Sequence, residues 1–137
     1  MNQTDPAMTQ VMIVPAGGEW LWSPMPLTDA AGTIAAAVGN RYRALALTDQ
    51  LTVLVGDHDK HLPVELNPYL PGIGRLYGRP LTGRGSAVFT GGLVRVGPEV
   101  RVMPLSAAHC HRIAEVVQAL QMRMLAIKPS RIEHSAS

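Results

Sequence analysis

The sequence predicts an α+β fold, with an antiparallel or mixed sheet of about six strands and two main helices. Two observations predict it. Short β-rich runs alternate with turn signals along most of the chain, and two segments, 30–38 and 106–125, repeat apolar residues at helical spacing. With 137 residues, 47% of them hydrophobic, the chain can bury one core. We therefore expect a single α+β domain over residues 11–127, a flexible N-terminus over 1–10 and a flexible tail over 128–137.

The first third of the chain predicts a hairpin followed by a helix. Residues 11–14 form a short apolar run, the segment 15–18 is a turn signal, and residues 19–22 can pair back on the first strand. Thr28 or Asp29 is the expected N-cap of a helix over 30–38, and Gly39 is a fitting stop for it.

The middle of the chain predicts strands around an irregular segment. Residues 41–47 and 51–56 read as an antiparallel hairpin, and 57–61 as a polar turn. Prolines and glycines dominate the start of 66–83, so only a short helix around 73–77 is expected there. A strand over 86–90 follows. A second hairpin then pairs 94–96 with 100–102, and we expect its valines on one face and its arginines on the other.

The last helix is predicted over 106–125, packed on the sheet, with Ser106 as its N-cap. One apolar stripe runs along it at spacings of three and four residues: Cys110, Ile113, Val117, Leu120 and Met124. Pro129 is expected to end the helix, because a proline inside a helix removes one hydrogen bond and clashes with the preceding turn.

Composition excludes several classes of function. A net charge of +2 is too small for strong nucleic-acid binding, so nucleic acid is disfavoured as a partner. No signal-peptide pattern opens the chain, and no apolar run approaches the roughly 18–20 residues that span a bilayer. Cys110 is the only cysteine, which points to a reducing cytoplasm. Charged residues are only 16% of the chain, which suggests apolar surface covered in a homo-oligomer.

The order of several short motifs resembles a known family. They are a strand ending at Pro15, a helix leading into Gly39 and two strands, the Leu-Pro-x-x-x-x-Asn type segment over 62–67, a Gly-x-x-x-Val type strand over 85–92, and the Leu-Ser start of the last helix at 105–106. Over residues 11–120 the chain is similar to a phage- and mobile-element-associated domain-of-unknown-function family, number three-eight-four-six.

The resemblance implies a role but no chemistry. It implies a non-enzymatic phage or mobile-element accessory protein that binds and sequesters or blocks a host component, in the cytoplasm of an infected or carrier bacterium. The family carries no settled activity, so the resemblance supplies no catalytic residue and no cofactor. A host protein is accordingly the first partner to expect, beside a second copy of the chain.

The Gly/Arg loop over 72–86 is the candidate ligand site. Glycines let backbone N–H groups converge on an anion, and arginines add bidentate contacts to phosphate. The candidate ligand-binding residues are Asn67, Gly72, Gly74, Arg75, Arg79 and Arg84. An alternative function is therefore a sponge for a small phosphorylated or nucleotide ligand, and the competing interpretation is an ordinary loop with solvated arginines.

Trp20 and Trp22 would share one face of a strand. Such a pair can stack on a base, but it more often packs at a sheet or a subunit interface, so we assign both to an interface. The polar turn 57–61 and the run 109–111 hold potential metal ligands. The turn needs polar residues anyway, and the two histidines of 109–111 diverge on a helix, so no metal site is expected. A small hydrolase or transferase stays the last alternative.

Overall fold

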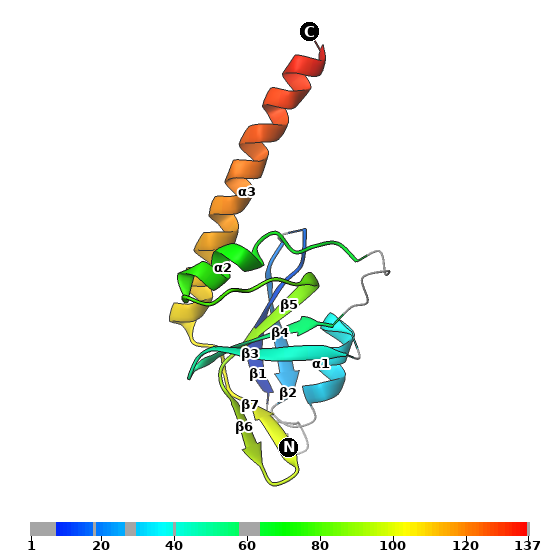
Figure 1. Ribbon diagram of the computed structural model, residues 1–137. Coiled ribbons are helices and arrows are strands. Elements are labelled where there is room, and N and C mark those ends of the chain that lie inside the picture. Colours follow the sequence, from blue (N-terminus) through cyan, green and yellow to red (C-terminus); the bar gives the residue numbers. More distant parts are fainter. Residues whose placement is uncertain (1–7, 18, 27–29, 40, 58–63, 137) are drawn as a thin grey trace, which may run out of the picture.

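The computed structural model describes residues 8–17, 19–26, 30–39, 41–57 and 64–136, and it confirms the α+β class. Seven strands and three helices follow one another in these residues (Figure 1). In chain order they are β1 (Met8–Val14), β2 (Leu21–Pro26), α1 (Ala30–Val38), β3 (Tyr42–Thr48), β4 (Leu51–Gly56), α2 (Leu70–Leu76), β5 (Arg84–Thr90), β6 (Leu93–Val96), β7 (Glu99–Val102) and α3 (Ala107–Ala136).

The strands divide into a five-stranded sheet and a separate hairpin. The sheet has the order β2-β1-β5-β4-β3, and every neighbouring pair in it is antiparallel. Among the described residues, β6 and β7 pair only with each other, so the seven strands do not form the single sheet of about six that the sequence suggested. The chain leaves the main sheet at Gly91, whose backbone lies against the carbonyl groups of Met103 and Pro104 too closely to admit a side chain.

One face of the sheet packs against α2 and α3 and forms the larger part of the core. Because side chains alternate across a strand, Val53 and Val55 of β4 point to this face together with Phe89 of β5. They meet Ile73 from α2 and Ile113 from α3, and all five are almost completely buried. This layer fixes the position of both helices over the sheet (Figure 1).

The opposite face is covered by α1 and by part of the hairpin. Leu54 and Val88 alternate with the residues above and pack here with Ile34 and Val38 of α1 and Val102 of β7. Helix α1 ends as predicted. Gly39 adopts a φ of 104°, and its N–H donates to the carbonyl oxygen of Ala35 at 2.8 Å. The sheet thus lies between a larger layer formed by α2 and α3 and a smaller layer formed by α1 and part of the hairpin.

The first strands begin elsewhere than predicted. Strand β1 starts at Met8, so residues 8–10 belong to the sheet. They pair with Pro26, Met25 and Pro24 of β2, which runs from Leu21 to Pro26 and not over 19–22. Residues 1–7 and the expected cap at 27–29 lie outside the described residues.

The start and the apolar stripe of α3 are confirmed. The backbone N–H of His109 donates to Ser106 Oγ at 3.1 Å, which makes Ser106 the N-cap. The stripe residues Cys110, Ile113 and Val117 are buried, and Leu120 and Met124 pack against the same core.

The predicted end of α3 is wrong. The helix continues to Ala136, past both residue 125 and Pro129, and extends away from the sheet (Figure 1). A proline costs a helix one hydrogen bond locally, but the helix-forming residues on either side can continue it. The predicted flexibility of residues 128–137 stays a prediction. No helix among the described residues is both long enough and apolar enough to cross a membrane.

The register of the second hairpin also corrects the sequence interpretation. Val94 lies opposite Arg101, and directly opposed residues of an antiparallel pair share a face. A valine and an arginine therefore project to the same side, and the valines are not separated from the arginines. Alternation within one strand does not fix the register between two strands, and the register decides which residues share a face.

Candidate functional site

The Gly/Arg loop is mostly ordered backbone in the structure. Residues 70–76 form α2, which begins earlier than the expected 73–77, and the helix ends in a Schellman motif. Gly78 has a φ of 69°, and its N–H donates to the carbonyl oxygen of Arg75 at 3.2 Å. The N–H of Arg79 donates to the carbonyl oxygen of Gly74 at 2.8 Å. These two N–H groups are therefore engaged inside the fold and do not face an anion.

The two glycines proposed to admit a ligand are packing residues. A Cβ at Gly72 would lie 3.2 Å from Val116 and 3.3 Å from Leu120 on α3. A Cβ at Gly74 would clash with the carbonyl oxygen of Arg79 and lie 2.8 Å from the Cβ of Leu81. The absence of side chains lets α2 approach α3 on one side and the returning chain on the other, which accounts for both glycines without a ligand.

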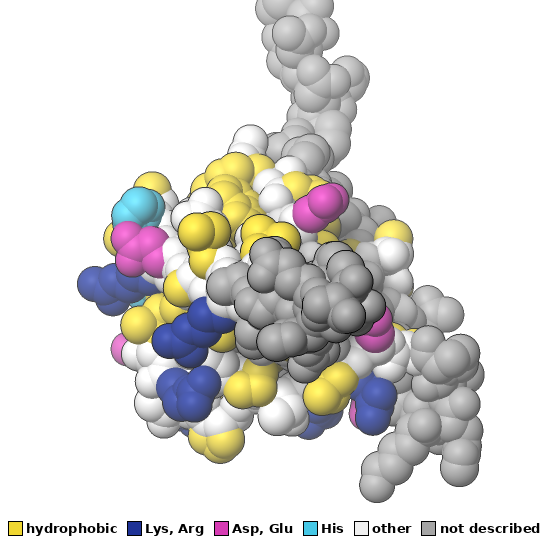
Figure 2. Space-filling model, turned by 90° about the horizontal axis from the view of Figure 1, so that it is seen from above, with side chains coloured by type: hydrophobic (Ala, Val, Ile, Leu, Met, Phe, Trp, Pro, Cys, Tyr) yellow, Lys and Arg dark blue, Asp and Glu magenta, His cyan; other side chains and the backbone are white. Residues whose placement is uncertain are grey.

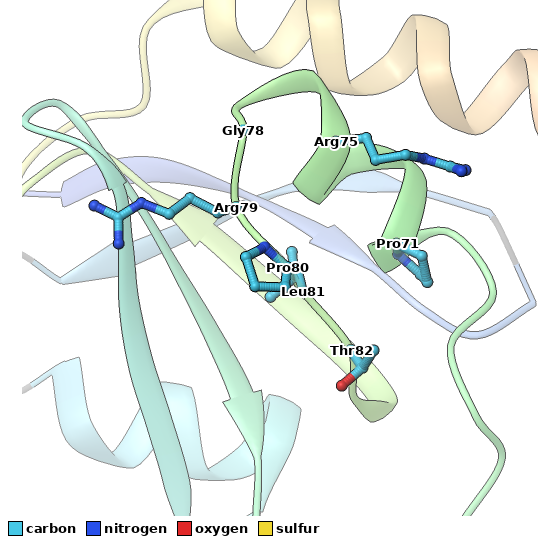
Figure 3. A pocket seen from close by; sticks show the side chains of 7 residues that line it. All are labelled: Pro71, Arg75, Gly78, Arg79, Pro80, Leu81 and Thr82. Atoms are coloured by element: carbon cyan, nitrogen blue, oxygen red, sulfur yellow. The ribbon is translucent and has the colours of Figure 1, made fainter.

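The structure brings two of the three predicted arginines to one recess. Arg75 and Arg79 line an open depression of about 480 Å³ beside α2, with Pro71, Pro80 and Leu81 among its other walls. Their side chains extend to opposite sides of it (Figure 3). A compact phosphate cannot receive both guanidinium groups in that arrangement, because bidentate contacts require convergent donors.

Arg84 belongs to a different place. Its Nη1 donates to the carbonyl oxygen of Val64 at 3.1 Å, and it lines a separate recess with Arg43 and Asp57. Asp57, which is exposed, is the first residue of the predicted polar turn 57–61. The other four residues of that turn lie outside the described part of the chain. The three arginines therefore do not form one site.

Asn67 is a structural residue that joins two strands to the loop. Its side chain is 1% exposed, and its Nδ2 donates to the carbonyl oxygens of Val14 at 3.0 Å and Gly85 at 2.9 Å. Its Oδ1 accepts from the backbone N–H of Tyr69 at 3.1 Å. The amide thus bridges the ends of β1 and β5 and has little capacity left for a ligand.

A second candidate site lies where β2 meets the first turns of α3. Trp20 and Trp22 line a recess of about 320 Å³ together with His111, Glu115 and Gln118. We call these five residues the tryptophan surface. Trp22 is 40% exposed, whereas Trp20 is partly buried against the main core. The sheet pairs Trp22 with Met12, so the indole is directed toward the face that carries α3.

The polar residues of this surface come from consecutive turns of α3. His111 and Glu115 are four residues apart, and Nε2 of His111 lies 2.9 Å from Oε1 of Glu115. Both side chains are well exposed, so this contact adds little stability. From above, hydrophobic side chains are spread over the molecule and basic side chains gather mainly on one side (Figure 2). The tryptophan surface combines exposed indole with polar groups at its border.

Sequence reasoning missed a polar cluster between α2 and α3. The Tyr77 hydroxyl lies 2.9 Å from Nδ1 of His109, and Arg112 is close enough to affect both groups. Burial, aided by the Arg112 cation, lowers the pKa of His109, whereas burial raises the pKa of Tyr77 against the opposing effect of Arg112. No spacing signal links residues 32 positions apart, so only the packing of the two helices reveals the cluster.

Cys110 is buried beside Met12, with the two sulfur atoms 3.8 Å apart, and burial raises the pKa of its thiol. It packs in the core, as its place on the apolar stripe predicted. In the part of the chain that the structure describes, no three His, Cys, Asp or Glu side chains gather as metal ligands would.

Comparisons of the chain with models of protein families, with curated proteins and with solved structures each return no match. The resemblance to the phage-associated domain family stays a prediction.

Proposed function

We propose that the chain is a non-enzymatic accessory protein of a phage or mobile element that binds a host protein through the tryptophan surface. Binding there would sequester or block the host component in the bacterial cytoplasm. The role comes from the family resemblance, and the place comes from the geometry of β2 and α3.

The exposure of Trp22 carries the proposal. The chain has two tryptophans, and both line the same recess, Trp22 exposed and Trp20 packed in part against the core. Exposed indole is costly in water, whereas tryptophan is the residue type most enriched among those that dominate binding energy at protein interfaces. His111, Glu115 and Gln118 supply the polar border that usually surrounds such an anchor.

The test is retention of a host protein by immobilised chain, with the parent compared to Trp22→Ala. Leu66→Ala is the matched control, because Leu66 is 58% exposed and does not line the tryptophan surface. We expect the parent and the control to retain the same host protein and Trp22→Ala to lose it by at least tenfold. Equal retention by all three would place the binding surface elsewhere.

A small phosphorylated ligand is the second candidate, and the recess between Arg75 and Arg79 favours it. The divergence of the two side chains requires an extended ligand, such as a dinucleotide, whose charged groups reach both ends (Figure 3). Calorimetric titration with mono-, di- and cyclic nucleotides tests this. Heat that disappears in the Arg75→Gln/Arg79→Gln variant supports the sponge, whereas no heat from the parent removes it.

A further inference from the structure

We propose that β3 is a self-association edge, along which two copies of the chain pair their β3 strands antiparallel about a two-fold axis. The two five-stranded sheets would then continue into one. This assembly does not depend on the tryptophan surface, since β2 and β3 lie at opposite edges of the sheet.

The two edges differ in their capacity to pair. An edge strand offers free N–H and C=O groups, and proteins commonly protect it with proline or with charge. Strand β2 contains Pro24 and Pro26, which have no N–H to donate. Strand β3 contains no proline, and Arg43 is its only charged residue. In Figure 1 it is the strand nearest the viewer, with no other described element drawn along its outer side.

The backbone register identifies which groups face outward. The N–H of Asp57 donates to the carbonyl oxygen of Arg41 at 2.8 Å, and Tyr42 lies opposite Gly56. Hydrogen-bonded and non-hydrogen-bonded pairs alternate along an antiparallel ladder, so 41, 43 and 45 bond to β4. The N–H and C=O groups of 42, 44 and 46 therefore point away from the sheet. A register shift between Ala46 and Thr48 ends the regular edge there.

The outward segment 42–46 is complementary to itself. With the two-fold axis at Ala44, Ala44 meets Ala44 of the partner subunit, and Tyr42 meets the partner subunit's Ala46. Arg43 then lies opposite the partner subunit's Leu45, so like charges are not opposed. Three hydrogen-bonded pairs give about six hydrogen bonds between the strands.

The side chains on the α1 side of this segment leave room for the pairing. Ala44 and Ala46 are exposed and small, and Tyr42 is 36% exposed. Pairing would lay Tyr42 of each copy across an alanine of the other, which covers apolar surface that the monomer leaves in water. A second copy therefore fits this edge in both backbone and side-chain chemistry.

The test uses opposite charges at the symmetry axis. Sedimentation equilibrium of the parent at 100 μM should give twice the chain mass of 14.7 kDa. Ala44→Glu and Ala44→Lys should each be monomeric, because each brings like charges together, and an equimolar mixture should regain the dimer. Ala119→Glu and Ala119→Lys are the matched controls on an exposed alanine of α3 and should stay dimeric.

A cysteine at the same position gives an independent measurement. Directly opposed residues of a hydrogen-bonded pair lie about 5.5 Å apart at Cα, within disulfide reach. Ala44→Cys should therefore oxidise to a covalent dimer, and Ala119→Cys should not. A monomeric parent, a mixture that stays monomeric while both charged variants are folded by circular dichroism, or no cross-link through residue 44 would each overturn the proposal.

Discussion

The segment 67–85 and the tryptophan surface differ in whether their functional groups are occupied by contacts within the fold or remain exposed. In the segment 67–85, the Asn67 amide hydrogen-bonds to three backbone groups. Gly74 has no side chain, which allows residues 79–81 to pack against it. On the tryptophan surface, Trp22 and Gln118 remain exposed. A loop rich in glycine and arginine resembles an anion-binding loop in sequence, yet its glycines can instead allow close packing within the fold. Binding capacity is better sought where polar and aromatic groups stay exposed.

The largest effect should follow Asn67→Ala. The change leaves the carbonyl oxygens of Val14 and Gly85 and the N–H of Tyr69 without their side-chain partner in a buried place. At about 1–3 kcal/mol for each group of this kind, we expect a loss of about 4 kcal/mol in the free energy of unfolding. Urea denaturation measures it, with Gln118→Ala as the exposed control. A loss below about 1 kcal/mol would restore Asn67 as a free ligand group.

Substitution of glycines should give a graded series. Gly74→Ala forces the backbone of 79–81 to move and should cost about 3 kcal/mol. Gly78→Ala meets open space but keeps a φ of 69°, so about 1 kcal/mol is expected. Gly17→Ala meets nothing within 4 Å and should be nearly neutral. Thermal and urea unfolding of the three variants check the order, and a neutral Gly74→Ala would show that the loop is looser than its packing indicates.

A smaller effect should appear in the pH dependence of stability. Burial lowers the pKa of His109 below its ordinary value of 6.5, so the unfolded chain binds a proton there more readily than the folded one. Stability from this group is complete above pH 6.5 and declines as the pH falls through the folded pKa. His109→Gln should flatten the slope of unfolding free energy as the pH falls below 6.5 in urea titrations. An unchanged slope would mean that burial and the Arg112 cation do not hold His109 neutral in the fold.

The smallest effect is expected from Arg75→Gln/Arg79→Gln. Both side chains are exposed and lie on opposite sides of their recess, so the free energy of unfolding should change by no more than about 0.5 kcal/mol. Retention of the host protein should also be unchanged. A loss of host-protein retention in the folded variant would move the binding surface from the tryptophan surface to α2.

Local patterns predicted the elements better than their arrangement. The stripe of α3, the Ser106 cap and the hairpin of β3 and β4 follow from spacing and turn residues, which act over a few positions. The separation of β6 and β7 from the main sheet depends on the close approach of Gly91 to Met103 and Pro104, which spacing does not reveal. The prediction that α3 ends at Pro129 was wrong because the helix-forming residues around the proline continue the helix to Ala136.

The candidate sites were predicted only in part. Sequence placed Trp20 and Trp22 on one strand face, but their common recess with α3 depends on how that helix crosses the sheet. Arg75, Arg79 and Arg84 are close in the sequence, but they lie on a helix, a turn and a strand. Arg84 therefore lines a different recess from the other two. The sequence makes Asn67 a candidate ligand-binding residue, whereas in the fold its amide donates to carbonyl oxygens at the ends of β1 and β5.

The closed base of the β6–β7 hairpin makes the protein a practical scaffold. The N–H of Gly91 donates to the carbonyl oxygen of Met103 at 2.9 Å, and the N–H of Met103 donates to the carbonyl oxygen of Gly92 at 2.9 Å. These two hydrogen bonds hold the two ends of the hairpin together at its base. Lengthening the exposed tip at 97–98 then costs only loop-closure entropy, about 0.6 kcal/mol per doubling. An epitope or fluorescent reporter inserted there would stand at the opposite end of the molecule from α3 (Figure 1).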